Sequence, residues 1–426
     1  MEREEIIIQR GETKDVNDII DFGNFVFSMA HRPHNFADLV PKCYASGQNH
    51  ADWHYLVREN EQIQALLMSM PQTASADHVY PKVSFQRYGI GTVSVHHRAR
   101  SKGYMRLLMH QAIADMYDAG AAYSFLGGQR QRYRYYGYEH AGTKLNASMS
   151  LRNITMTWPS LRDQETPKDI VLVDCPEEGP IFEQVYALYL KHTSLNVRPK
   201  EQFTLITRSF NRHLKLLLRD ETVLAYVIAA EDWSTVDEFV KADSTLPWEW
   251  AIYYLYQLAG ISQASFSLAQ VESGDQHDLQ KALLYGAENF SLSTGGMYLI
   301  LDFAKTIAML LSDKASRMPL APGFLTLTVE DCPEPTKSEQ TVTIEVTSDR
   351  LIIESGQEEI LNVPLTFKHA EVETTAEAEV SMTYFDCIAD LFSFRGHISG
   401  NLQRLLPAEI ASWFPLNPTV LPVDNA

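Results

Sequence analysis

Apolar and polar residues alternate along the first 150 residues in a way that predicts one α/β layer. An apolar strand at 1–10 precedes apolar positions that recur at helical spacing over 16–27. The segments 53–72 and 79–95 alternate apolar and polar residues between polar turns, and they predict an antiparallel meander. A stripe with a 3.6-residue period then covers 105–116, and a further strand follows it. The expected order is strand, helix, three strands, helix and strand.

A second unit repeats this order of elements from residue 169 onward. A strand at 170–175 is followed by apolar positions at helical spacing over 181–189, and then by a hairpin that turns at 219–221. The later segment 247–260 has no basic, glycine-containing loop, so it can pack but cannot hold phosphates. We therefore expect the second unit to be a degenerate copy of the first.

A third pattern begins near Gly295. An amphipathic segment at 297–313 precedes several alternating strands, and a helix is expected at 384–393. This order predicts an α+β domain. The tail that follows contains three prolines and is expected to be extended. The predicted domain ranges are 1–150, 151–294 and 295–412, followed by the tail at 413–426.

Composition narrows the classes of protein to which the chain can belong. At 426 residues, with 45% hydrophobic residues, the chain is too long for one core and should form about two to four globular domains. A formal net charge of -18, concentrated after residue 150, argues against nucleic-acid binding. Four cysteines without a C-x-x-C pair argue against a metal site and favour reduced thiols. An acidic N-terminus, without an apolar run of about 20 residues, favours a cytoplasmic protein with no membrane partner.

One basic segment contrasts with this acidic background. Residues 79–114 contain six lysines and arginines but no aspartate or glutamate. Within the segment, a strand ending at Val95 leads through a basic loop to Gly103, which opens the predicted helix. Backbone amides and the helix dipole would meet there, and Gly103 would let a diphosphate approach the backbone. The loop matches neither the P-loop nor the dinucleotide fingerprint, since the G-x-G at 89–91 falls inside a strand.

The sequence VHHRARSKGYM, from Val95 to Met105, resembles the acetyl-CoA motif V-x-P-x-x-[RQ]-x-x-G-x-[GA] of the GNAT acetyltransferase superfamily. Arg100 and Gly103 match in type and spacing, whereas His97 and Met105 replace the usual proline and small residue. The resemblance implies acetyl-CoA as cosubstrate and no metal. It also implies that a backbone N–H near Val93 polarises the thioester carbonyl. The residues implied to bind acetyl-CoA are Val93, Val95, Arg100, Ser101, Lys102, Gly103, Tyr104 and Arg106.

A second segment, YRYYGY from Tyr133 to Tyr138, resembles the Y-x-x-x-G-[FY] sequence with which GNAT domains commonly end. By this resemblance Tyr133 is the acid that returns a proton to the CoA thiolate. Tyr135 and Tyr136 are neighbouring alternatives. The competing interpretation is an aromatic cluster that packs without a catalytic role.

The layout of the whole chain is similar to that of the Eis (enhanced intracellular survival) family. That resemblance implies tandem GNAT-like domains, the second degenerate, followed by a sterol-carrier-like α+β domain. It implies direct N-acetyl transfer to a primary amine of a small cationic or peptide-like substrate, such as an aminoglycoside. It also implies that the protein is a homo-oligomer, either a trimer or a hexamer. In this family a terminal carboxylate enters the active site. Ala426 is therefore a candidate base, since the strand at 83–95 contains no carboxylate.

Other interpretations of these residues stay open at this point. The basic loop could be a solvated surface turn. His96 and His97 could supply a general base, but neighbouring strand residues point to opposite faces of a sheet. Asp38, Glu59 and Glu61 could attract a cationic amine or simply lie at the surface. The alternative function is a catalytically weak GNAT scaffold whose third domain binds an apolar ligand.

Overall fold

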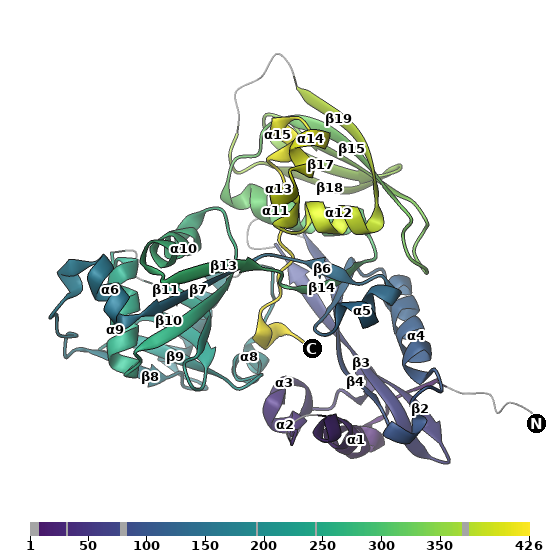
Figure 1. Ribbon diagram of the computed structural model, residues 1–426, viewed down its shortest axis with the longest axis horizontal. Helices are drawn as coiled ribbons and strands as arrows, with labels where there is room; N and C mark the ends of the chain where they lie inside the picture. Colours follow the sequence, from purple (N-terminus) through teal and green to yellow (C-terminus); the bar gives the residue numbers. More distant parts are fainter. Residues whose placement is uncertain (1–7, 31–32, 77–82, 193–194, 243–244, 369–374) are drawn as a thin grey trace, which may run out of the picture.

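The structure, a computed structural model, describes residues 8–30, 33–76, 83–192, 195–242, 245–368 and 375–426. Within these ranges the chain forms three β-sheets with helices packed against them (Figure 1). This arrangement confirms the predicted mixture of helices and strands. Residues 1–7 and 79–82 of two predicted strands lie outside the described ranges.

Each sheet gathers strands from more than one stretch of sequence. The first has the order β1 (Ile8–Arg10), β2 (His54–Glu59), β3 (Gln62–Ser75), β4 (Ser84–Val95), β5 (Tyr123–Leu126), β14 (Gly296–Ile300) and β6 (Glu139–Ala141). The second has the order β13 (Asn289–Ser293), β7 (Lys144–Ser150), β12 (Gln263–Ala269), β11 (Thr235–Lys241), β10 (Thr222–Ala230), β9 (Arg212–Arg219) and β8 (Ile170–Asp174). The third has the order β18 (Glu358–Pro364), β17 (Arg350–Ser355), β16 (Gln340–Val346), β15 (Gly323–Glu330) and β19 (Ala376–Thr383).

The helices divide into three groups, one with each sheet, and each sheet with its helices is called a unit below. The first unit contains α1 (Val16–Ala30), α2 (Phe36–Leu39), α3 (Pro41–Tyr44), α4 (Tyr104–Asp118) and α5 (Arg130–Tyr133). The second contains α6 (Leu151–Thr157), α7 (Pro180–His192), α8 (Phe203–Thr207), α9 (Trp248–Ala259) and α10 (Gly274–Gly286). The third contains α11 (Phe303–Arg317), α12 (Tyr384–Leu391), α13 (Arg395–Ser399), α14 (Asn401–Leu405) and α15 (Ala408–Ala411).

Strands β4 and β5 separate at the end of the first sheet that leads into α4. Their parallel pairing ends at Ile90 and Leu126, although β4 continues to Val95. The register between β4 and β3 shifts just after Gly91, where Thr92 has a φ of 49°. This β-bulge interrupts the regular ladder, so residues 92 and 93 lie outside the regular pairing of β4 with β3.

The first two sheets exchange strands. Residues 144–150, which follow β6 directly, form β7 in the second sheet, and 296–300 return as β14 between β5 and β6. The two chain crossings lie at Gly142 and Gly295, and the hydroxyl of Thr419 lies against both. The sequence-based ranges put β7 in the first unit and β14 in the third. A strand pattern does not show with which sheet a strand pairs, and the four ranges stay predictions.

The first and third sheets share one hydrophobic core. Helix α11 lies between them, and its buried residue Ile307 belongs to the same cluster as Leu67 of β3 and Ile344 of β16. The second sheet packs around separate clusters that include Phe239 and Ile252. Because apolar burial is the main stabilising contribution to folding, the first and third units depend on each other more than either depends on the second.

The tail leaves the third unit and ends between the first and second units (Figure 1). Trp413 is buried, and its indole N–H donates to a backbone carbonyl at 2.8 Å. The side-chain amide of Asn417 donates to the carbonyl of Thr143 at 3.0 Å. Trp413 belongs to the turn that ends α15, and apart from a 3₁₀ turn at Pro422–Asp424 residues 414–426 form no helix, as their prolines predict.

None of the helices within the described ranges has the length and apolar content needed to span a bilayer. The histidine, cysteine, aspartate and glutamate side chains in that part of the chain form no group of three or more that could hold a metal ion.

Candidate active site

The loop between β4 and α4 presents a helix N-terminus without a side-chain cap. Gly103 is the N-cap residue of α4, with a φ of 85°. The N–H of Leu107 is the first to find a backbone acceptor there, the carbonyl of Gly103 at 3.1 Å. The preceding amides, those of Tyr104, Met105 and Arg106, therefore have no acceptor within the helix, and the helix dipole adds positive potential at the same place.

Space and charge at this loop fit an anionic nucleotide. A Cβ atom on Gly103 would meet no heavy atom within 4 Å, so a ligand can approach the backbone there. The side chains of Arg100, Ser101 and Arg106 are exposed, and the first turn of α4 contains no acid. These features suit the diphosphate of CoA, which the sequence predicts at this position.

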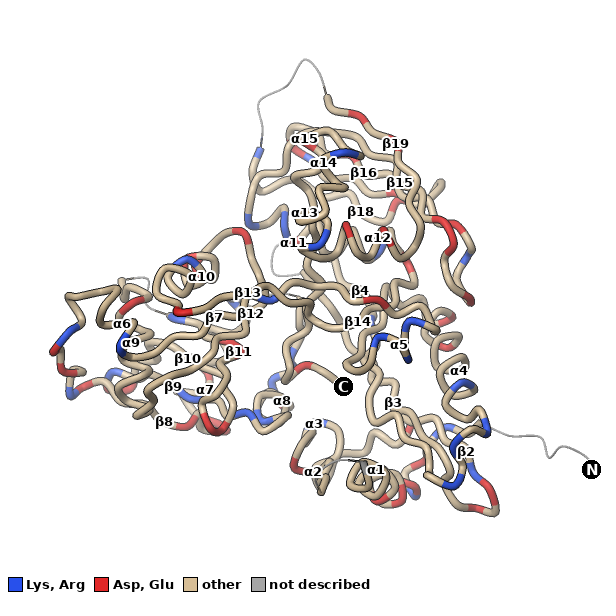
Figure 2. The backbone as a smooth tube through the Cα atoms, in the orientation of Figure 1, with Lys and Arg blue, Asp and Glu red and all other residues tan. Residues whose placement is uncertain are grey.

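Figure 2 also shows Lys or Arg positions on α4 and α5. Arg130 of α5 and Arg134, the residue after that helix, form ion pairs with Glu139 and do not add free charge.

Lys102 and Tyr104 contribute to the loop mainly through their backbone, because both side chains bind Glu59 at the end of β2. The Lys102 ammonium lies 2.7 Å from the Glu59 carboxylate, and the Tyr104 hydroxyl donates to the same group. These hydrogen bonds lower the pKa of Glu59. Glu59 is thus a partner of the loop, and it is not available to attract a cationic amine as one interpretation of the sequence allowed.

The bulge in β4 is fixed by a buried hydrogen-bond network. The hydroxyl of Tyr44 lies 2.7 Å from the Thr92 hydroxyl and 2.9 Å from Nε2 of His54. Burial lowers the pKa of His54 to about 4, so its imidazole is neutral at pH 7. Val93 and Val95, on the same face of β4, are half-buried against the core of the first unit. The network thus orients the strand segment at which the sequence predicts a carbonyl-polarising amide.

Ala426 lies directly on β4. A Cβ atom built on Gly89 would come within 2.6 Å of the Ala426 Cβ, and one on Gly91 would come within 2.6 Å of the Ala426 carboxyl carbon. Only glycine at these two positions leaves room for the tail. The carboxyl group of Ala426 forms no ion pair with any residue in the described part of the chain. The structure thus brings Ala426 to the strand that leads into the basic loop.

Tyr133 lies beside the same part of the sheet. It is 8% exposed, its ring packs against Gly128, and burial raises the pKa of its hydroxyl. Within the described ranges this hydroxyl makes no hydrogen bond, whereas that of Tyr138 is bound to Ser124 at 2.8 Å. The amide of Asn425 approaches Gly127, the residue before Gly128. Tyr133 and the last residues of the tail therefore lie beside the part of the first sheet where the pairing of β4 with β5 ends.

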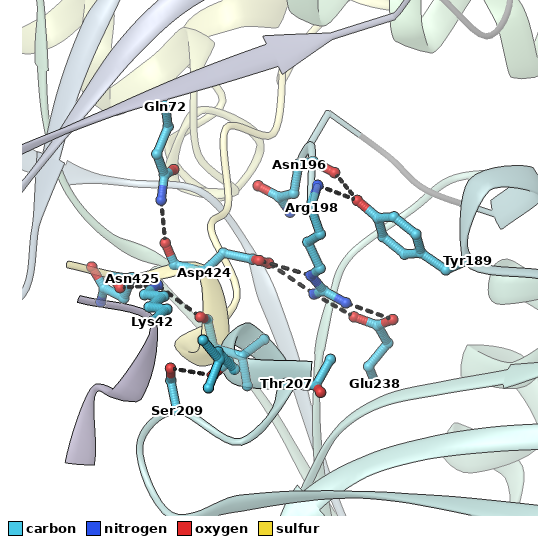
Figure 3. Close-up of polar contacts among 12 residues, drawn as sticks. Lys42, Gln72, Tyr189, Asn196, Arg198, Thr207, Ser209, Glu238, Asp424 and Asn425 are labelled. Carbon is cyan, nitrogen blue, oxygen red and sulfur yellow. Dashed lines mark hydrogen bonds and ion pairs between the residues drawn. The ribbon is translucent and has the colours of Figure 1, made fainter. Parts of the chain in front are cut away.

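A buried ion-pair network anchors the tail to the second unit (Figure 3). Two nitrogens of Arg198 donate to the two carboxylate oxygens of Asp424, each at 2.8 Å, and Arg198 also binds Glu238 at 2.8 Å. Burial opposes ionisation of Asp424, but Arg198 outweighs it and lowers the pKa of that carboxyl. Arg198 is only 1% exposed in its side chain, so this contact is shielded from solvent.

The first unit holds the same stretch of tail from the opposite side. The ammonium of Lys42 donates to the carbonyls of Val423, at 2.8 Å, and of Asn425. The side-chain amide of Gln72 donates to the carbonyl of Asp424 at 2.6 Å. Burial, reinforced by nearby positive charges, lowers the pKa of Lys42 to about 8. Residues of both units thus bind the tail just before Ala426, which lies on β4.

The remaining candidates from the sequence make other contacts. Asp38 is at the surface, where it accepts a hydrogen bond from Asn35 at 2.5 Å. The rings of His96 and His97 lie 4.3 Å apart beside Phe25. The expectation that they point to opposite faces is wrong, because the strand ends at Val95 and a 3₁₀ turn begins at His97.

The residues that hold the tail have no motif in the sequence. Lys42 and Val423 are 381 positions apart, and Arg198 and Asp424 are 226 apart. Periodicity and motif spacing report only on neighbours along the chain, so no local signal marks these residues.

Comparison with known families supports the interpretation of the first unit. Residues 8–141 match the family model described as acetyltransferase (GNAT) domain. The chain matches none of the curated proteins in sequence. The first unit therefore matches the domain family that the segments at Arg100 and Tyr133 resemble.

Solved structures share the fold along nearly the whole chain. A probable N-acyltransferase from Enterococcus faecalis is similar with a TM-score of 0.62 and 15% identity, over 98% of this chain and 97% of that one. A GCN5-related N-acetyltransferase from Anabaena variabilis has a TM-score of 0.60 and 14% identity, over 96% of each chain. Eis1 from Mycobacterium abscessus has a TM-score of 0.55 and 12% identity, over 95% of this chain and 94% of that one. At such identities the likeness concerns the fold, and with the matched domain it supports an acyltransferase.

Proposed function

We propose that this protein transfers the acetyl group of acetyl-CoA directly to a primary amine of a small or peptide-like substrate. The observation that carries the proposal is the uncapped N-terminus of α4, which follows the bulged strand β4 through an exposed loop free of acids. That loop lies in the part of the chain that matches the acetyltransferase domain. The residues assigned to acetyl-CoA are Val93, Val95, Arg100, Ser101, Lys102, Gly103, Tyr104 and Arg106.

Ala426 and Tyr133 can move the protons that the reaction requires. Acetyl-CoA supplies an activated thioester, and the neutral amine forms the new C–N bond as the C–S bond breaks. The carboxylate of Ala426 on β4 takes up the proton that the amine loses. Tyr133, which like any ordinary phenol is protonated at pH 7, donates a proton to the thiolate. Burial raises its pKa further. An amide at the β4 bulge, near Val93, polarises the carbonyl.

The alternative function, an apolar-ligand carrier, needs a cavity larger than the one that the third sheet and its helices enclose. That cavity, among apolar side chains that include Leu325 and Leu402, has a volume of about 10 Å³. That is about the space of one water molecule. A cavity of about 180 Å³, lined in part by Leu310, Phe394 and Leu416, lies where the third unit meets the tail and the second unit. We retain the enzyme and, as the sequence resemblance implies, further propose that it works in the cytoplasm as a trimer or hexamer.

Cosubstrate binding and thiol release test this proposal. Acetyl-CoA at about 100 times its Kd should stabilise the protein by about 2.7 kcal/mol, which a thermal shift detects. Release of free CoA should then depend on an added primary amine, and mass spectrometry should find that amine 42 Da heavier, the mass of an acetyl group replacing a hydrogen. If acetyl-CoA neither shifts the melting temperature nor is consumed with any amine, the proposed function is wrong.

A further inference from the structure

A cavity of about 260 Å³ lies beside the tail, between the first and second units. Its lining contains three charged side chains, Lys42, Arg87 and Asp424, and is otherwise neutral. Figure 3 shows Lys42 and Gln72 pointing toward the backbone of the tail, whereas the Asp424 side chain points toward Arg198. The chemistry of the cavity therefore depends on which groups Lys42, Arg87 and Asp424 already bind.

Both cations are buried and bound to neutral acceptors. Lys42 is 5% exposed and donates to two backbone carbonyls of the tail. Arg87 is 2% exposed and donates to the side-chain oxygens of Gln72 at 3.2 Å, Tyr123 at 3.0 Å and Asn196 at 2.6 Å. These bonds use two of the three ammonium hydrogens and three of the five guanidinium hydrogens. Within the described ranges neither side chain forms an ion pair with a carboxylate.

The one acid that lines the cavity is already neutralised. Both carboxylate oxygens of Asp424 accept hydrogen bonds from Arg198, on the side of the second unit. Asp424 is therefore not a site for a cationic substrate. The acidic pocket that a cationic amine would favour is absent from this part of the described structure, and the lining has a net positive charge.

Buried cations without a charged partner are costly unless an anion completes the site. Carboxylates and phosphates accept charge-assisted hydrogen bonds from both ammonium and guanidinium groups. Resting on the proposed function, we infer that the acetyl acceptor carries an anionic group, a carboxylate or phosphate, that binds Lys42 and Arg87 while its amine approaches β4.

The geometry of β4 connects this cavity with the site of transfer. Residues 87, 89 and 91 share one face of the strand because side chains alternate. Ala426 lies over Gly89 and Gly91, and Arg87 lies one step further along the same face. One such step is about 7 Å. An acceptor that spans this distance places its anionic group at Arg87 and its amine near Ala426.

Matched acceptors decide whether the anionic group matters. The full-length protein is assayed with acetyl-CoA and ω-amino acids from glycine to 6-aminohexanoate, with aminoalkyl phosphates, and with plain alkylamines of equal length. We expect kcat/KM to be about tenfold or more higher for an anionic series than for the alkylamines, mainly through a lower KM. The ω-amino acid series also reports the preferred spacing, and the phosphate series separates the two kinds of anion.

Variants of Arg87 connect that preference to the cavity. Arg87→Gln should abolish the advantage of the anionic acceptors, whereas Arg87→Lys should retain part of it. Arg152→Gln, at an exposed arginine of α6, is the matched control and should change nothing. The thermal shift with acetyl-CoA shows whether each variant is folded. If Arg87→Gln does not fold, Lys42→Met makes the same comparison.

A binding measurement is independent of turnover. By calorimetry, the acetylated product of the best ω-amino acid should bind the wild-type protein at least tenfold more tightly than the neutral N-alkylacetamide. Equal binding of the two, together with equal kcat/KM for anionic and neutral amines, overturns the inference while leaving an active acetyltransferase. Product binding without acetyl-CoA turnover overturns the proposed function and leaves the anion site.

Discussion

Burial distinguishes Tyr133 from the tyrosines beside it. Tyr135 is 72% exposed, whereas Tyr133 is 8% exposed and packs on Gly128. A phenol keeps its proton at pH 7, and burial raises the pKa of Tyr133 further, so a proton is present that it can give to a thiolate.

Replacement of Tyr133 by phenylalanine removes only the hydroxyl. We expect Tyr133→Phe to lower kcat about 100-fold, because a positioned general acid contributes on that order. Thermal stability and acetyl-CoA binding should stay close to wild type, since the hydroxyl has no hydrogen-bond partner within the described ranges. Steady-state thiol release measures the effect, with the exposed Tyr135→Phe as control. Full turnover in Tyr133→Phe would assign the proton donation to another group.

Lys42 predicts a pH dependence for binding of the anion. Its pKa in the folded protein is about 8, so its charge is present below that pH and is lost above it. The affinity for an N-acetylated ω-amino acid, which has no titrating amine, should therefore fall as the pH rises from 7 to 9.5. Calorimetry over that range measures it, and Lys42→Met should bind weakly at every pH. A flat wild-type profile would show that the Lys42 charge does not contribute.

The lowered pKa of Lys42 makes the stability of the fold change with pH in the opposite direction from anion binding. Between about pH 8 and the ordinary lysine value of 10.5, the unfolded chain binds a proton at Lys42 that the folded protein does not. The contribution of this group to stability therefore rises with pH over that window, while its contribution to anion binding falls.

Some candidate site residues have a local signal in the sequence and others do not, and the roles of all of them stay predictions. Gly103 and Tyr133 belong to short motifs whose spacing is visible along the chain, and the structure brings both to the first sheet. Lys42, Arg87 and Arg198 act only through residues that are distant in sequence. Their role follows from sheet pairing and from the path of the tail, which no local pattern encodes.

At the scale of elements, α4 and α7 begin in the same way but differ in charge. Gly103 precedes α4 with a φ of 85°, and Gly179 precedes α7 with a φ of 95°. Neither position has a heavy atom within 4 Å of an added Cβ. Glu183 lies in the first turn of α7, whereas the first turn of α4 has no acid. This difference supports the prediction that only the first unit holds phosphates.

The two glycines provide a matched pair of substitutions. Gly103→Ala and Gly179→Ala each force an L-residue into the left-handed region and should each cost about 1–2 kcal/mol of stability. Only Gly103→Ala should also weaken acetyl-CoA binding, by tenfold or more, because its methyl group occupies the space of the diphosphate. Thermal melts with and without acetyl-CoA make the comparison. An equal loss of binding in both variants would place the cosubstrate elsewhere.

Periodicity and turns predicted the pairing of strands that are neighbours in the chain, such as β2, β3 and β4, but not the pairing of strands that are far apart in the chain. The stripe over 105–116 lies within α4, and the hairpin at 219–221 joins β9 to β10. The segment 297–313, expected to be one amphipathic element, divides into β14 and α11 because Asp302 caps the helix. An apolar run shorter than a full helix fits either state, so only its neighbours in space decide.

At the scale of the whole molecule, the first unit is incomplete on its own. Its sheet takes β14 from residues beyond the second unit, and its core continues into α11 and the third sheet. The second sheet, in contrast, is built entirely from residues 144–293.

Fragments should reflect this difference. We expect 1–150 to show no cooperative thermal transition by far-UV circular dichroism, because β5 and β6 lose the strand between them. The fragment 144–293 should melt cooperatively, although less stably than in the full chain, since Val423 of the tail packs in one of its clusters. A cooperative transition in 1–150 would mean that its sheet closes without β14.

The crossing at Gly142 and Gly295 also fixes an order of events during synthesis. The ribosome releases all strands of the second sheet before it releases β14, so the middle unit can finish folding while the N-terminal sheet still has two unpaired edges. Those edges stay unpaired while about 150 further residues are translated, and they can pair with other nascent chains during that time. A protein built in this way benefits from a chaperone that covers its earliest residues until its later ones arrive.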